Sequence, residues 1–99
     1  MPGSPSTEAL HAKIEGIVQG VGFRYFVKQQ AEALSITGWV RNRYLDESVE
    51  VWAEGPRPAL EAFLDDLRRG PRSAVVHHIS IDWPAATGKF RQFNIAPTE

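Results

Sequence analysis

The chain has 99 residues, 42% of them hydrophobic, which suits one domain with one core and is too short for two. Eleven Lys and Arg against twelve Asp and Glu give a formal net charge of -1, so no overall basic field draws the chain onto nucleic acid or anionic lipid. The sequence contains no cysteine, which excludes a disulfide framework and a thiolate metal site. No apolar run approaches the roughly 18 residues that cross a bilayer, so we expect no membrane partner. The lack of cysteine fits a reducing cytoplasm, and the size and charge suit a monomer.

The first part of the chain predicts a tail, a strand and a helix. Residues 1–9 are rich in Pro, Gly, Ser and Thr and predict a flexible tail before a folded domain over residues 10–99. From His11, the stretch "HAKIEGIV" alternates polar and apolar residues, as a strand with one buried face does. After the glycines, an apolar stripe broken only by a glutamine recurs at helical spacing: Phe23, Phe26, Val27, Gln30, Ala31 and Leu34.

The remaining segments predict three more main strands, a second helix and a short last strand. "ITGWVRNRY" and "SVEVWAE" are rich in β-branched and aromatic residues, and the "LDE" between them lacks the Gly or Asn of a tight turn, so we expect a longer or bulged loop there. "GPRP" starts a helix that ends at Gly70 and Pro71. "AVVHHISIDW" predicts a fourth strand and "FRQFNI" a short fifth one.

The order of these elements predicts an α+β fold. The order β-α-β-β-α-β fits a ferredoxin-like split βαβ sandwich, in which two helices cover one face of a mainly antiparallel sheet. The first two strands then run parallel on either side of the third, so their carboxyl ends lie at the same edge. Residues 19–23 leave the first of these ends, and Arg41 and Asn42 lie near the second.

The glycines at this edge predict an anion site. Gly20 and Gly22 allow successive backbone N–H groups to point inward at the start of the helix, where a phosphate-sized anion binds well. Arg24 adds a planar fork of donors in a helical turn that the macrodipole already makes positive, an arrangement that a dianion would stabilise. The residues also fit a plain tight turn followed by a solvated arginine, and neither common nucleotide-binding motif is present.

The motifs "GIVQGVGFRYFV", "GWVRN", "VEVWAEGP", "AVVHHISI" and "FNI" closely resemble the acylphosphatases, from about His11 to Ile95. The resemblance implies a ferredoxin-like fold and a hydrolase that uses no metal or cofactor and converts a small acyl phosphate to a carboxylate and orthophosphate. By position, Arg24 would bind the phosphoryl group and Asn42 would orient the attacking water. The phosphate cradle would be the backbone of Gln19, Gly20, Val21, Gly22 and Phe23. Phosphate or another anion would bind as product or inhibitor.

The segment after Asn42 departs from the pattern of this family. The family usually has an acidic residue and a glycine between the Asn and a Val-Glu pair, whereas "NRYLDESVE" has one extra residue and no glycine. We expect the strand to hold Asn42 in place, because a loop absorbs an extra residue at small entropic cost.

Other functions have weaker support in the sequence. The adjacent His77 and His78 face opposite sides of a strand, which spoils them as a chelating pair. RNA binding on sheet aromatics is disfavoured because Glu50 and Glu54 flank Trp52 on the face without helices. Two alternatives stay open: an anion-binding or regulatory domain that has lost turnover through the altered hairpin, and an accessory domain that serves a partner.

Overall fold

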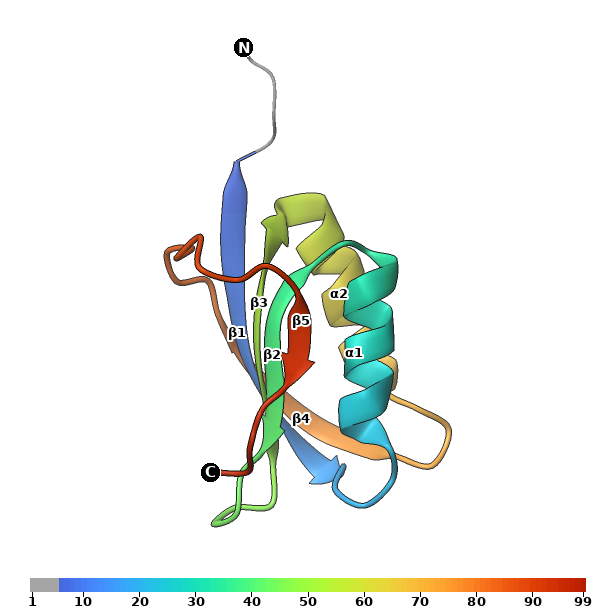
Figure 1. The fold of residues 1–99 in the computed structure, drawn as a ribbon. Coiled ribbons are helices and arrows are strands. Elements are labelled where there is room, and N and C mark those ends of the chain that lie inside the picture. Colours follow the sequence, from blue (N-terminus) through green and yellow to red (C-terminus); the bar gives the residue numbers. More distant parts are fainter. Residues whose placement is uncertain (1–5) are drawn as a thin grey trace.

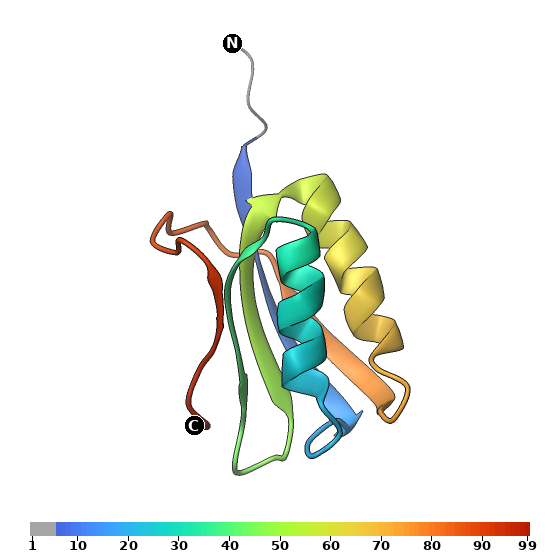
Figure 2. The same ribbon diagram turned by 45° about the vertical axis from the view of Figure 1, so that its right-hand side comes forward.

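The computed structural model describes residues 6–99. Its elements follow the predicted order: β1 (Thr7–Ile17), α1 (Phe23–Ala33), β2 (Thr37–Asn42), β3 (Val49–Pro56), α2 (Arg57–Arg69), β4 (Val75–Asp82) and β5 (Phe93–Ile95). The sheet order is β4-β1-β3-β2-β5, and only the β2–β5 pair is parallel. Both helices lie on the same face of the sheet (Figures 1 and 2). The ferredoxin-like α+β fold and its short fifth strand are therefore confirmed.

The core lies between the helices and the sheet. Helix α1 buries Phe23, Val27 and Ala31 at a spacing of four, and α2 buries one apolar stripe made of Leu60, Phe63, Leu64 and Leu67. Burying a large apolar side chain contributes about 1.5–3 kcal/mol, so these stripes account for the docking of both helices. The Phe63 and Phe93 ring centroids are 6.1 Å apart, which joins β5 to the same core.

Strand β1 begins earlier than the sequence pattern predicts. It starts at Thr7, which pairs with Pro56 at the far end of β3, and Ala9 and Leu10 are fully buried. The long β3 supplies backbone partners for these residues, and burial of Ala9 adds an apolar contact that a solvated tail would lack. Residues 7–9 therefore belong to the sheet instead of the predicted tail, whose first five residues lie outside the described part of the chain.

The sheet face without helices differs from the expected open acidic surface. Glu50 and Glu54 are only 7% and 3% exposed. Glu54 accepts hydrogen bonds from the backbone N–H groups of Thr87 and Gly88, both at 3.0 Å, because the segment between β4 and β5 crosses this face. Trp52 also donates to Glu54 from its indole nitrogen, at 2.7 Å. The chain itself thus covers part of the surface that would have to stack RNA bases.

Candidate active site

A cleft of about 220 Å³ opens where β1 and β2 end. The two strands run parallel because each pairs antiparallel with β3, so their carboxyl ends meet at one edge of the sheet (Figure 1). The cleft is lined from three stretches far apart in sequence, by Val18, Gly20, Gly22, Phe23, Arg24 and Tyr25, by Asn42 and by Ile95. The topology therefore brings the two predicted catalytic side chains to one site.

The loop before α1 has the backbone conformation that requires glycine. Gly20 and Gly22 have φ angles of 74° and 78°, in the left-handed region. A Cβ at either position would have no neighbouring atom within 4 Å, so crowding by the protein does not explain the glycines. Gly22 caps α1 without a side-chain hydrogen bond to the first N–H groups. These groups are therefore available to an anion.

Arg24 lies in the first turn of α1 and lines the cleft. This turn contains no acidic residue, and no carboxylate lines the cleft. Arginine is permanently charged, and the positive end of the helix macrodipole lies beside it. The cleft thus combines two positive features with no compensating charge among its lining residues, which favours a bound anion.

Asn42 is the last residue of β2 and pairs with Val49 across the ladder to β3. Its carbonyl accepts a hydrogen bond of 3.1 Å from the Glu99 N–H group, so β2 is held on its other side as well. The side-chain oxygen Oδ1 is buried and has no hydrogen-bond partner among residues 6–99. An unsatisfied buried acceptor costs about 1–3 kcal/mol, so a donor that reaches this amide, such as a water in the cleft, gains stabilisation.

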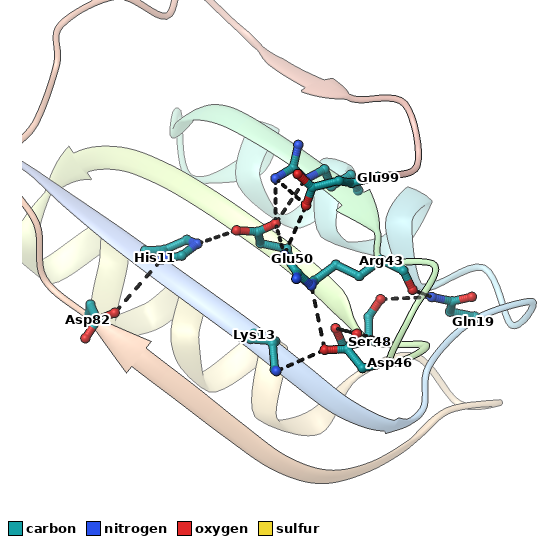
Figure 3. A network of polar contacts seen from close by, with 10 residues as sticks. His11, Lys13, Gln19, Arg43, Asp46, Ser48, Glu50, Asp82 and Glu99 are labelled. Atoms are coloured by element: carbon teal, nitrogen blue, oxygen red, sulfur yellow. Dashed lines mark hydrogen bonds and ion pairs between the residues drawn. The ribbon is translucent and has the colours of Figure 1, made fainter.

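Gln19 has a role that the sequence reading missed. Its side-chain Nε2 donates to the carbonyl oxygens of Arg43 and Ser48, each at 2.9 Å, and so ties the glycine loop to the β2–β3 hairpin (Figure 3). Neither Gln19 nor Val21 lines the cleft, whereas the other predicted cradle residues do. A polar residue beside the glycines was visible in the sequence, but its partners lie more than twenty positions away.

The altered hairpin is stabilised by side chains instead of a glycine. Glu47 has a φ angle of 57°, the left-handed conformation that glycine adopts most easily. Asp46 Oδ1 accepts hydrogen bonds from the Ser48 N–H group at 3.1 Å and hydroxyl at 2.6 Å, and Lys13 lies 3.0 Å from Oδ2. The Ser48 hydrogen bonds and the Lys13 charge hold the pKa of Asp46 far below its usual range. The loop therefore takes up the extra residue while Asn42 remains at the cleft.

A network of charged side chains surrounds the end of β2 on the sheet face without helices (Figure 3). Glu50 Oε1 accepts from Arg41 Nε at 2.9 Å and from an Arg43 guanidinium nitrogen at 3.2 Å, and His11 Nε2 lies 2.6 Å from Oε2. Both arginines also pair with the Glu99 carboxylate.

The network lowers the pKa of a buried acid at its centre. Burial alone raises the pKa of Glu50, but the hydrogen bonds from His11 and the two arginines outweigh it and bring the pKa below its ordinary value. The two arginines are the chain neighbours of Asn42, so this network restrains the strand end that carries the amide.

Two other features are absent from the part of the chain that the structure describes. No group of three or more His, Cys, Asp or Glu side chains among residues 6–99 is placed to hold a metal ion. Neither helix in this part of the chain is long and apolar enough to cross a bilayer.

Comparison with known proteins identifies the family. The acylphosphatase family model matches residues 10–95. The chain is 46% identical over 84 residues to an acylphosphatase of Salinibacter ruber, covering 85% of this chain and 87% of the relative. It is 49% identical over 79 residues to one of Moorella thermoacetica, covering 80% and 84%. The crystal structure of acylphosphatase from Bacillus subtilis superposes with a TM-score of 0.85 at 36% identity, covering 90% of this chain and 98% of that one. The chain belongs to the acylphosphatase family.

Proposed function

We propose that this acylphosphatase hydrolyses small acyl phosphates by direct attack of water on a phosphoryl group held by Arg24 and the backbone of residues 19–23. Asn42 orients the water. One observation carries the proposal: a left-handed glycine loop, an arginine and an asparagine whose side-chain oxygen has no hydrogen-bond partner within residues 6–99 line the same cleft. At about 220 Å³ the cleft is smaller than the roughly 300–1,000 Å³ of sites for drug-sized ligands, which favours a small substrate.

The reaction needs no covalent intermediate. The water oxygen forms a bond to phosphorus as the bond from phosphorus to the acyl oxygen breaks, and the carboxylate leaves with that electron pair. The transition state spreads charge over the phosphoryl oxygens, where the N–H groups of the loop and the Arg24 guanidinium donate hydrogen bonds. The geometry thus supplies positioning and electrostatic stabilisation, which are the main contributions that phosphoryl transfer requires.

The water proton goes to the substrate. Asn42 is not a base at neutral pH, and Arg24 does not lose its proton. One proton of the water therefore passes to a phosphoryl oxygen, and the products are a carboxylate and dihydrogen phosphate. A rate profile that required a protein base with a pKa near neutrality would contradict this step.

The decisive experiment measures hydrolysis of benzoyl phosphate at neutral pH with excess chelator. Arg24→Ala and Asn42→Ala should each lower kcat/KM by about 10²- to 10³-fold, the usual effect of losing one transition-state donor. Leu45→Ala is a control, because Leu45 is 91% exposed and lies outside the cleft. Binding of inorganic phosphate without turnover in the intact protein would instead identify an anion-binding domain.

The same site should bind the product. Inorganic phosphate should inhibit competitively, and Arg24→Ala should weaken this inhibition. We also propose that the protein acts in the cytoplasm as a monomer. Its cysteine-free sequence supports a reducing compartment, and its size suits a monomer, so light scattering after gel filtration should give the mass of one chain.

A further inference from the structure

The cleft has an apolar side that the chemistry at phosphorus does not use. Tyr25 and Ile95 both line it, and they remain 61% and 42% exposed. A single exposed apolar side chain is common on a protein surface and needs no explanation. Two that converge from separate elements on one cleft with an anion-binding loop are typical of a small-molecule site.

Both side chains are carried by regular structure. Tyr25 follows Arg24 in the first turn of α1. Ile95 is the last residue of β5, where it pairs with Val40 of β2, and the next N–H group donates to the Val40 carbonyl at 2.8 Å. The backbone that carries the two apolar groups is therefore fixed relative to the polar groups of the cleft, which binding selectivity requires.

We propose that Tyr25 and Ile95 form an acyl subsite that selects substrates with an aromatic or branched apolar acyl group over those with a small one. The inference rests on the proposed function. Once the loop and Arg24 hold the phosphoryl group, the acyl group must extend within the same cleft. Apart from the two proposed catalytic side chains Arg24 and Asn42, the remaining side chains of the cleft are the buried Val18 and Phe23, and Arg24 is the only charged residue among the described lining. The lining thus offers apolar contact to the acyl group and no separate charged partner for a polar one.

The subsite predicts a selectivity that two substitutions should remove. The experiment compares kcat/KM for benzoyl phosphate and acetyl phosphate in the intact protein and in Tyr25→Ala, Tyr25→Phe and Ile95→Ala. The ratio of the two values should fall about tenfold in Tyr25→Ala, the lower end of what one apolar group in a pocket contributes, and severalfold in Ile95→Ala. The loss should appear mainly as a higher KM for benzoyl phosphate, because the contact is made with bound substrate and transition state alike.

Two controls separate the apolar contact from other effects. Tyr25→Phe keeps the ring and should keep the ratio, whereas Leu45→Ala removes an apolar side chain that is 91% exposed outside the cleft and should also leave it unchanged. Intrinsic reactivity of the two substrates cancels when variants are compared. An unchanged ratio in both alanine variants, or an equal loss in Tyr25→Phe and Tyr25→Ala, would overturn the subsite while hydrolysis stands. Absence of hydrolysis of either substrate by the intact protein would overturn the proposed function and the subsite with it.

Discussion

Gly22 and Gly88 provide a matched test of the role of the glycine loop. Their φ angles are 78° and 70°, and a Cβ at either position has no neighbour within 4 Å. An L-residue in this conformation costs about 1–2 kcal/mol, and the smaller entropy of unfolded alanine offsets about 0.4–1 kcal/mol. Gly22→Ala and Gly88→Ala should therefore each lower the free energy of unfolding by about 1 kcal/mol. In a chain of this size that lowers Tm by roughly 4–8 °C.

The two variants should differ in catalysis, because only Gly22 lines the cleft. A strained or altered backbone there misplaces the N–H groups that face the phosphoryl oxygens, and kcat/KM for benzoyl phosphate should fall by about 10²- to 10³-fold. Gly88→Ala should keep the activity of the intact protein. Urea unfolding and hydrolysis well below Tm measure the two effects separately. Equal losses of activity in both variants, or full activity in Gly22→Ala, would refute the assignment of the loop as a phosphate cradle.

Three further predictions concern the hairpin and the charged network. Glu47→Gly should raise the free energy of unfolding by about 1 kcal/mol, because Glu47 has a φ angle of 57°; an unchanged urea midpoint would contradict this. Gln19→Ala removes two hydrogen bonds to the hairpin, each with a net contribution of about 1 kcal/mol. It should lower kcat for benzoyl phosphate more than it raises KM, and an unchanged kcat would show that these hydrogen bonds do not position the catalytic groups. The lowered pKa of Glu50 favours folding above the ordinary glutamate pKa of about 4.3, and this stabilisation is lost as pH falls below it. Tm measured from pH 7 to 3 should fall less steeply in Glu50→Gln, and parallel curves would refute the linkage.

Much of the fold was predictable because local patterns and tertiary packing agree. Phe23, Val27 and Ala31 recur at helical spacing and are the residues that α1 buries. Val49 and Val51 alternate with polar residues and are fully buried in β3. When the spacing of apolar residues matches the face that the fold buries, the sequence predicts each helix and strand correctly. The order of these elements then determines which strand ends lie at the same edge of the sheet.

The charged network was not predictable from local sequence. Glu50 reads as an exposed acid in an alternating strand, but it is buried with partners from two other parts of the chain: His11, and the two arginines Arg41 and Arg43. These arginines pair in turn with Glu99. The cross-strand partner of Glu50, Arg41, could be found only after the β2–β3 register was known. The early start of β1 was unpredictable for the same reason, because Thr7 belongs to a strand only through its pairing with Pro56 at the distant end of β3.

Asn42 keeps its position although the hairpin loop that follows it has an extra residue and no glycine. Its position is set by the ladder to β3, where it pairs with Val49, and by the hydrogen bond from the Glu99 N–H group. Neither restraint involves the turn itself. An extra loop residue costs little closure entropy. Glu47 adopts the left-handed conformation that a glycine would adopt more easily, and the resulting strain lowers the stability of the loop. The hydrogen bonds of Asp46 to Ser48 offset part of that strain. The cost of the missing glycine is therefore expected in the free energy of unfolding, whereas the Asn42 amide, which we propose orients the water, keeps its place at the end of β2.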